Sequence, residues 1–438
     1  MDNETRLLVQ YDNKTAGFIY PSKNSIFEYS KEWVKNNYHP ISISMSTSRS
    51  FFNTLETQTF LENLMPEGSF LDTLCYSVGI SNKNPFDFFH RFGKECGGAL
   101  SIFPEDQLSD AQTSMDYRDI TLSLQQILSK RFVDVPNLIA ATNARISLAG
   151  AQNKLAVKLE NGHCFVPAEN SFSPTDHILK MGSGKYENLV LNELFCLELA
   201  KEIGLPAVDA IYQKIADKDV LFLKRYDRVE KDGKLIRLHQ EDFCQALGCS
   251  NIIKYEDMGG PNISECLRLF NNHSFAKADK AKNIFIDSLI FNYIIGNCVG
   301  HSKNYSLLYD HNALTSKNNS FTLSPIYDVL CTLAYPELTS NMAFSIGGEQ
   351  DIRNINVKNW HLFAERVRLG PESLKERCSK ITSSIDNSLN KLIDKHENIY
   401  GAKDFYDKLA VIIHTQNKDI KLYIDEVITA LDKATLRM

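Results

Sequence analysis

Two residues with hard oxygen donors stand out in the second half of the chain. Asn304 lies in the segment GNCVGHSKNYS, residues 296 to 306, and Asp328 lies in LSPIYDVL, residues 323 to 330. Each borders an apolar run, as expected of residues that a folded core holds in place. An amide oxygen and a carboxylate are ligands that suit Mg²⁺. The pair therefore predicts a magnesium site.

The segment around Asn304 departs at one position from a pattern that phosphoryl transfer uses. In protein kinases a carboxylate stands five residues before the metal-binding Asn, as D-x-x-x-x-N, and accepts the proton of the substrate hydroxyl. Here that position is Val299, and no carboxylate lies between Gly296 and Asn304. Loss of a positioned base costs about 10²–10⁴-fold in rate, or ~3–5 kcal/mol of barrier. We therefore expect ATP binding without useful turnover.

Upstream segments contain groups suited to phosphate. SLAGAQNK, residues 147 to 154, has small residues that leave backbone N–H groups uncovered for phosphate oxygens, although a tight hairpin turn explains the same pattern. Lys180 ends the strand pattern DHILK and is either a phosphate ligand or a solvated edge-strand lysine. Lys158 is a rival for the phosphate role. Glu193 is either the partner of such a lysine or an exposed helix residue.

A further segment, FLKRYDR at residues 222 to 228, ends a predicted strand before QEDFCQ at residues 240 to 245. Backbone groups at such a strand end suit an adenine edge, with Tyr226 as a stacking surface. The alternative is a strand followed by an ordinary helix start, because Glu241 and Asp242 complement the dipole of any helix N-terminus.

The N-terminal part reads as a small antiparallel sheet followed by helices. The β-type runs RLLVQY, AGFIY, SIFEYS and ISISMS lie within residues 6 to 46. Residues 54 to 95 have helical patterns with breaks at Pro66 and Asn84, after which GGALSIF returns to extended chain. The polar stretch from 104 to 118 is the expected linker.

Beyond this linker the pattern is strands, one helix, strands and a helical half. ARISLAGAQNKLAVKLENGHCFVP predicts strands with a turn at Asn161-Gly162, and AIYQKI and VLFLKRYD predict two more strands. The helix from about 186 to 203 has one apolar face, made of Phe195, Cys196, Leu199 and Ile203. We expect an α+β fold with two lobes, divided into residues 1–110, 119–226 and 227–438.

Bulk properties exclude several classes. A net charge of -6 and a pI near 6.0 offer no general attraction to nucleic acid. The ten cysteines are scattered without a C-x-x-C pair, which favours buried thiols in a reducing compartment. The sequence has no signal pattern and no uninterrupted apolar stretch of about 18 residues. We expect a soluble, cytoplasmic protein.

With these segments in order, the chain resembles the HipA family of bacterial serine/threonine kinases, the toxin half of a toxin–antitoxin pair. The resemblance runs from the N-terminal strands to about residue 345. It implies a two-lobed protein-kinase-like fold with an N-terminal sheet-and-helix subdomain and a mostly helical C-terminal lobe. The segments that carry it are FLENLMPEG, ISLAGAQNKLAVKL, HILK, NELFCLELAKEIGL, KRYDR, QEDFCQALG, KYEDMGGP, IGNCVGHSKNYSLL and SPIYDVL.

The resemblance also implies site residues, cofactors and partners. Asn304 and Asp328 correspond to the Mg²⁺ ligands, and Ser147 to an autophosphorylated serine. Family members phosphorylate glutamyl-tRNA synthetase and bind a dimeric helix-turn-helix antitoxin that holds them on operator DNA. The residues implied to bind ATP are Ala149, Gly150, Ala151, Gln152, Asn153, Lys154, Lys180, Lys224, Arg225, Tyr226, Gln240, His301, Ser302, Lys303, Asn304, Tyr327 and Asp328.

The sequence departs from the family at two of these places. Lys224 stands where the hinge often has an acidic residue, which matters little because a hinge binds adenine through its backbone. Val299 replaces the catalytic Asp, either naturally or by deliberate substitution in a toxin. Two other functions stay open: an ATP-binding corepressor module that partners a DNA-bound antitoxin, and a small-molecule kinase, which leaves residues 1 to 110 unexplained.

Overall fold

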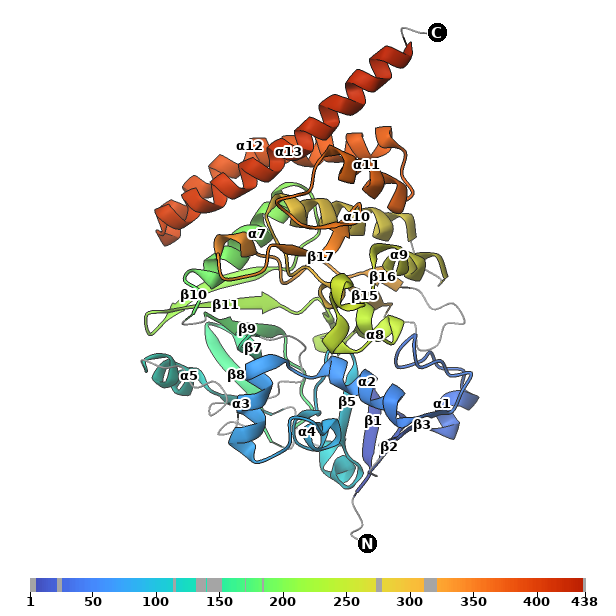
Figure 1. Ribbon diagram of the computed structural model, residues 1–438. Helices are drawn as coiled ribbons and strands as arrows, with labels where there is room; N and C mark the ends of the chain where they lie inside the picture. Colours follow the sequence, from blue (N-terminus) through green and yellow to red (C-terminus); the bar gives the residue numbers. More distant parts are fainter. Residues whose placement is uncertain are drawn as a thin grey trace. The chain divides into compact units, whose positions relative to one another are not determined.

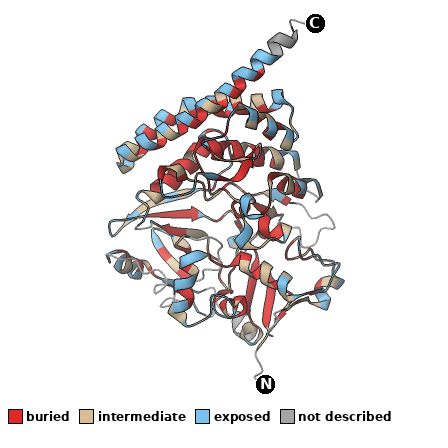
Figure 2. Cartoon of the chain, viewed as in Figure 1, coloured by how far each residue is buried: buried red, intermediate tan, exposed pale blue. Residues whose placement is uncertain are grey.

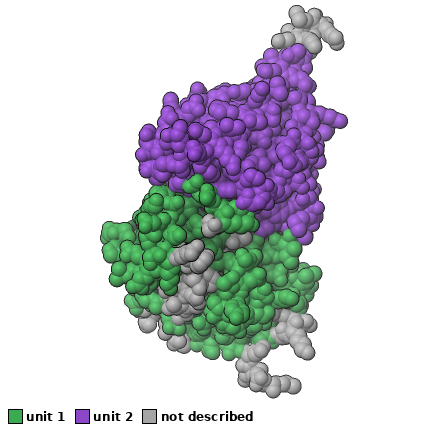
Figure 3. Space-filling model, turned by 60° about the vertical axis from the view of Figure 1, so that its left-hand side comes forward, with its two compact units in different colours: residues 1–190, 209–252, 306–322 green, residues 191–208, 253–305, 323–438 purple. Residues whose placement is uncertain are grey.

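The structure is a computed structural model that describes residues 5–21, 26–112, 116–130, 139, 152–169, 171–182, 185–272, 278–310 and 321–435. The chain forms two compact units (Figure 3). Unit 1 comprises residues 1–190, 209–252 and 306–322, and unit 2 comprises residues 191–208, 253–305 and 323–438. Each unit is therefore assembled from separate segments of the sequence. The domain boundaries expected from the sequence stay a prediction.

Unit 1 begins with the predicted antiparallel sheet, which has five strands in the order β4-β3-β2-β1-β5 (Figure 1). The helices that follow start where the sequence predicts, since Asn53 and Glu56 form a capping box and Pro85 opens a helix capped by Asn84. The elements are β1 (Leu7–Tyr11), β2 (Lys14–Tyr20), β3 (Ile26–Tyr29), α1 (Lys31–Lys35), β4 (Phe51–Phe52), α2 (Thr54–Leu64), α3 (Gly68–Val78), α4 (Pro85–Phe92) and β5 (Leu100–Pro104).

The strand predicted at ISISMS is wrong, because these residues form turns. Other groups take the backbone N–H groups that strand pairing would use. Ile41 N donates to the hydroxyl of Tyr29 at 2.9 Å, and Ile43 N donates to the carboxylate of Glu241 at 3.0 Å. Ser42 also accepts the backbone N–H of Met45 at its carbonyl, at 3.0 Å. Hydrogen bonds to side chains that are distant in the sequence therefore override the alternating pattern.

A second sheet in unit 1 has six strands in the order β10-β11-β9-β7-β8-β6. Alternate residues of β7 face opposite ways: Leu155 and Val157 belong to the same apolar core as the N-terminal sheet, whereas Lys154 and Ala156 lie on the other face. The expected linker contains a short 3-10 helix, η1 (Glu105–Gln112). The remaining elements here are β6 (Tyr117–Asp119), α5 (Thr121–Leu128), β7 (Lys154–Glu160), β8 (His163–Pro167), β9 (His177–Met181), β10 (Ala210–Ile215) and β11 (Lys218–Lys224).

Small elements complete unit 1. They include a hairpin of β12 and β13 and a three-stranded sheet in the order β14-β15-β16. The predicted helical half thus also contains strands. These elements are β12 (Arg228–Lys231), β13 (Lys234–Arg237), β14 (Gln240–Asp242), α8 (Phe243–Leu247), η2 (Asn251–Ile253), β15 (Ser306–Tyr309) and β16 (Phe321–Leu323).

Unit 2 is mostly helical, in line with the predicted helical half. Helix α10 is buried along most of its length (Figure 2), and α12 and α13 run side by side (Figure 1). The elements are α7 (Leu189–Glu202), η3 (Glu256–Met258), α9 (Ile263–Asn272), α10 (Ala278–Ile294), η4 (Ser302–Asn304), η5 (Thr332–Ala334), β17 (Asn341–Ile346), β18 (Glu349–Asp351), α11 (Val357–Arg366), α12 (Pro371–Tyr400) and α13 (Lys403–Thr435).

Helix α7 is buried more completely than its sequence pattern indicates. Beyond the predicted apolar face, Val190, Leu191, Leu194 and Leu197 are also buried. A helix that is apolar on most sides belongs in the core of a large unit. Among the helices of the described residues, none is long and apolar enough to cross a membrane. The ten cysteines are free thiols and mostly buried, as predicted.

Candidate functional site

The two predicted metal ligands meet within unit 2. Asn304 Nδ2 donates a hydrogen bond to Asp328 Oδ2 at 2.9 Å, and the backbone N–H of His301 donates to Asn304 Oδ1 at 3.0 Å. The backbone of Asp328 is left-handed, with φ 57. Asp tolerates this conformation better than most residues, although it still costs energy. The arrangement brings the side-chain amide of Asn304 and the carboxylate of Asp328 together, and both groups carry oxygen atoms of the kind that a hard divalent cation binds.

The loop before Asn304 is fixed by polar contacts that do not involve the side chain of Val299. The hydroxyl of Thr332 donates to Gly296 O at 3.0 Å and accepts from Cys298 N at 2.8 Å. Val299 N donates to Asn297 Oδ1 at 3.2 Å. The partly exposed side chain of Val299 is therefore not what holds the loop in shape.

His301 is held as a neutral imidazole. Burial lowers its pKa well below the ordinary range, and the nearby positive charges of Lys254 and Lys303 lower it further. Its ring packs edge-on against Tyr255, with ring centroids 5.0 Å apart. The hydroxyl of Ser302 donates to the carbonyl of Lys254 at 3.0 Å. This loop thus presents lysine charge and a neutral ring beside Asp328.

Asn192 on α7 is a positioning residue that the sequence analysis missed. Its side-chain amide donates to Cys331 O at 2.9 Å and accepts from Cys331 N at 2.8 Å. These bonds hold the segment just after Asp328. The available signal was a polar residue inside the apolar run LVLNELF. The neighbouring Glu193 is also buried, so the exposed-helix interpretation of Glu193 is wrong.

Two lysines face each other in unit 1. Lys154 on β7 and Lys180 on β9 are direct cross-strand partners, and both are buried. Like charges directly opposite each other destabilise a sheet unless negative charge lies close by. The rival Lys158 is engaged elsewhere, because its ammonium lies 2.8 Å from the carboxylate of Glu160 and 4.7 Å from the ring centroid of Tyr117. Lys154 and Lys180, in contrast, place two buried lysine side chains side by side on neighbouring strands.

The predicted hinge residues differ in the hydrogen bonds that they form. Lys224 N donates to Asp209 O at 2.8 Å and Arg225 N donates to Asp176 O at 2.9 Å, so these two amides are already used. Tyr226 hydrogen-bonds through its hydroxyl to Gln240 Oε1. Tyr226 and Gln240 are both partly exposed, so the structure places these two predicted residues together at the surface of unit 1.

The structure thus assembles the predicted site as two separate groups of residues, one in each unit. Unit 1 contains the lysine pair and the Tyr226–Gln240 pair, and unit 2 contains the metal ligands with His301 and Lys303. Tyr327 in unit 2 donates through its hydroxyl to Lys303 O at 2.9 Å. Gln152 and Asn153 lie just before β7. The remaining predicted residues, Ser147, Ala149, Gly150 and Ala151, lie outside the described residues.

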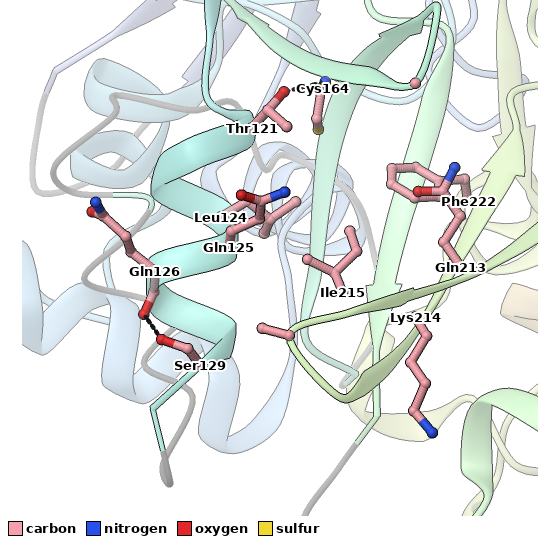
Figure 4. A pocket seen from close by; sticks show the side chains of 12 residues that line it. Thr121, Leu124, Gln125, Gln126, Ser129, Cys164, Gln213, Lys214, Ile215 and Phe222 are labelled. Carbon is pink, nitrogen blue, oxygen red and sulfur yellow. Dashed lines mark hydrogen bonds between the residues drawn. The ribbon is translucent and has the colours of Figure 1, made fainter.

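Unit 1 also contains a pocket of about 560 Å³ between α5 and the β10–β11 hairpin (Figure 4). One wall is α5, where Thr121 Oγ1 accepts the backbone N–H of Cys164 at 2.9 Å. Leu124, Ile215 and Phe222 supply apolar side chains. Among the described residues, none that is predicted to bind ATP lines this pocket.

Comparisons with known proteins cover most of the chain. A family model described as the HipA N-terminal domain matches residues 7–103, and one described as the HipA-like C-terminal domain matches residues 146–389. "Putative kinase Y4mE" from Sinorhizobium fredii is 32% identical over 406 residues, which cover 90% of this chain and 93% of the relative. "Serine/threonine-protein kinase toxin HipA" from Shewanella oneidensis is 27% identical and covers 83% of each chain.

A solved structure has the same fold. It is the Shewanella oneidensis complex of HipA, HipB and operator DNA, matched with a TM-score of 0.80 at 23% identity. The match covers 96% of this chain and 99% of that chain. The α+β, two-lobed architecture expected from the sequence is therefore confirmed.

Proposed function

This chain belongs to the HipA family of kinases, and we propose that it binds Mg–ATP but transfers the phosphoryl group poorly because Val299 stands in the place of the catalytic Asp. The observation that carries the proposal is the Asn304–Asp328 pair, in which the amide nitrogen of Asn304 lies 2.9 Å from a carboxylate oxygen of Asp328. A cation bound by both side chains would replace the hydrogen bond between Asn304 Nδ2 and Asp328 Oδ2, and the fold already brings the two side chains together.

Each unit contributes groups suited to one part of the nucleotide. Lys154 and Lys180 place two lysine side chains on adjacent strands, and ammonium groups bind phosphate oxygens through charge-assisted hydrogen bonds. Tyr226 and Gln240 offer a ring and an amide to the base. The uncovered backbone expected at Ala149 to Ala151 supports the same assignment from the sequence.

The metal ligands would be Asn304 Oδ1 and the carboxylate of Asp328. When bound there, Mg²⁺ neutralises charge on the phosphate oxygens. Lys303 adds positive charge in the same unit. The neutral state of His301 means that it adds no cation to this group and that its ring can accept a hydrogen bond.

The weak step is proton acceptance from the substrate hydroxyl. Val299 offers no acceptor, and the loop from Gly296 to Asn304 contains no carboxylate. Positioning and charge neutralisation carry most of a phosphoryl transfer, so nucleotide binding is independent of this loss. The loss fits either a naturally inactive kinase or a toxin inactivated by replacement of Asp at 299.

The partners follow from the family. We propose that residues 1 to 110 dock a dimeric HipB-like antitoxin, and that operator DNA is reached mainly through it, because a chain of net charge -6 attracts DNA poorly. The HipA relative from Shewanella oneidensis was solved with HipB and operator DNA. Ser147 is the proposed autophosphorylation site, glutamyl-tRNA synthetase is the proposed protein substrate, and the cytoplasm is the proposed compartment.

A second candidate function is favoured by Val299 itself. A chain that binds Mg–ATP without turnover acts as a corepressor module, in which nucleotide stabilises the form that partners a DNA-bound antitoxin. The two functions differ in whether a labelled γ-phosphate ever leaves the nucleotide.

Calorimetry with ATP in excess Mg²⁺ tests the binding claim. We expect saturable binding to the unsubstituted chain and weaker binding to Lys180→Met, which removes one of the opposed ammonium groups but keeps the length of the side chain. Lys158→Met is the matched control and should bind as the unsubstituted chain does, because Lys158 is paired with Glu160. Absence of ATP binding by the unsubstituted chain would contradict the proposal.

A further inference from the structure

A buried ionic cluster lies where β11 leaves its sheet. The guanidinium of Arg225 donates two hydrogen bonds to Asp227, at 3.0 and 2.8 Å, and Arg228 forms an ion pair with Asp227 at 3.0 Å. Both arginine side chains are 1% exposed, and that of Asp227 is 3% exposed. Burial alone would raise the pKa of Asp227, but Arg225 and Arg228 hold that pKa well below its usual range. Asp227 is therefore held as a carboxylate between the two arginines.

The fourth member of the cluster, Glu95, comes from the N-terminal region between α4 and β5. Its Oε1 accepts from Arg228 Nη2 at 2.9 Å and lies 3.3 Å from Arg225 Nη1. The same oxygen accepts from Thr175 N at 2.9 Å and from the Thr175 hydroxyl at 3.0 Å. One carboxylate oxygen thus joins residues at the end of β11 to a residue just before β9.

Gly98, three residues after Glu95, contacts the same ionic cluster. Gly98 N donates to Asp227 Oδ2 at 2.8 Å, and Gly98 O accepts from Arg228 at 3.1 Å. Gly98 has φ +72, and a Cβ at this position would lie 2.6 Å from Gln240 N. Only glycine fits this close approach without strain. The segment from Glu95 to Gly98 therefore sets the position of Gln240 as well as that of β11.

These contacts surround the groups that unit 1 is proposed to use for nucleotide. Strand β9 carries Lys180, whose cross-strand partner on β11 is Leu221. Residues 224 to 226 follow β11 directly. Because a buried carboxylate that satisfies several charged donors is costly to lose, any change at Glu95 must move the groups that it holds.

We infer that Glu95 is a positioning residue for the nucleotide, through which the N-terminal region sets the geometry of Lys180, Tyr226 and Gln240. This inference rests on the proposed ATP binding. It gives residues 95 to 98 a role within the kinase itself, beyond the proposed docking of an antitoxin. It also makes nucleotide affinity sensitive to whatever binds or distorts this region.

The test is Mg–ATP and Mg–GTP affinity in Glu95→Asp, which keeps the charge but shortens the side chain by one methylene. We expect ATP affinity to fall by about 5–150-fold, the usual range of coupling between connected sites, with a smaller loss for GTP, because the base-facing groups are displaced. Gly98→Ala is an independent variant that pushes directly on Gln240, and we expect it to reduce ATP preference in the same way.

Two controls separate positioning from general destabilisation. Glu105→Gln removes a carboxylate of the N-terminal region that pairs with Arg6, at 2.5 Å, and should leave both affinities unchanged. Leu64→Ala opens the core around α2 and should lower the melting temperature without changing the ATP-to-GTP ratio.

The outcomes are distinguishable. If the unsubstituted chain does not bind ATP, the proposed function fails and this inference fails with it. If the unsubstituted chain binds ATP, and folded Glu95→Asp and Gly98→Ala bind both nucleotides unchanged, the inference alone is wrong. Equal losses for ATP and GTP that follow melting temperature, as in Leu64→Ala, would also overturn it.

Discussion

Replacing Val299 by Asp should restore phosphoryl transfer while leaving nucleotide binding nearly unchanged. The backbone at this position is held by Asn297, which accepts from Val299 N at 3.2 Å, and by His301, whose N–H donates to Val299 O at 2.8 Å. Neither bond involves the side chain, and Val and Asp are similar in size. The new carboxylate therefore enters a loop whose backbone conformation does not depend on the side chain at position 299.

The expected gain in rate follows from the contribution of a general base, which Val299 cannot supply. A positioned base contributes about 10²–10⁴-fold, and we expect a gain of at least about 10²-fold, or ~2.7 kcal/mol of barrier, because the proposal leaves only this base missing. The loop after this position carries Lys303, whose positive charge favours the ionised form of a nearby carboxylate.

The assay is single-turnover transfer from γ-labelled ATP, with Val299→Asn as the control of similar shape that lacks the carboxylate. Ser147→Ala in the same background identifies label that reaches Ser147. A Val299→Asp variant that folds, binds Mg–ATP as tightly as the unsubstituted chain and transfers no more label than Val299→Asn would refute the reasoning.

Two further predictions concern stability. Asn192→Ala leaves both backbone groups of Cys331 without their side-chain partner, so urea denaturation should show a loss of about 2–4 kcal/mol, and an unchanged midpoint would contradict this role. Burial raises the pKa of Glu241 to about 7 from 4.5, so between these pH values the unfolded chain ionises while the folded chain keeps its proton. The free energy of unfolding should therefore fall by up to about 3 kcal/mol as pH rises through this window. Glu241→Gln should remove that slope, and a slope that persists in the variant would refute the assignment.

Much of the fold could be predicted because its strands and helices follow local patterns. Asn53 and Asn84 cap helices at the expected places, and Asn161 and Gly162 form the expected turn with positive φ. The strand predicted at ISISMS is wrong because the groups that bind its backbone, on Tyr29 and Glu241, lie in other parts of the sequence. Alternation alone does not reveal that a distant carboxylate will take the backbone N–H groups.

The importance of Asn304 and Asp328, which the structure brings together, could be predicted because each sits in a short motif of its own. The residues that hold the pair could not, since Asn192 and Thr332 act through bonds to backbone groups that only the fold brings near. For Arg225 the motif predicts a role that its side chain does not take. Its place in KRYDR suggests the hinge, but its side chain is buried in an ionic cluster with Glu95, so a contact with nucleotide from this residue would have to come from its backbone.

The most direct test of the account is the Mg²⁺ dependence of ATP binding in Asp328→Asn. This change keeps the shape and the hydrogen-bonding capacity beside Asn304 but removes the negative charge that a divalent cation requires. We predict that Mg²⁺ increases the ATP affinity of the unsubstituted chain, measured against ATP in EDTA, and that this increase is lost in Asp328→Asn while the affinity in EDTA is not reduced. An equal Mg²⁺-dependent increase in both proteins would show that Asp328 does not hold the metal and would contradict the proposed site.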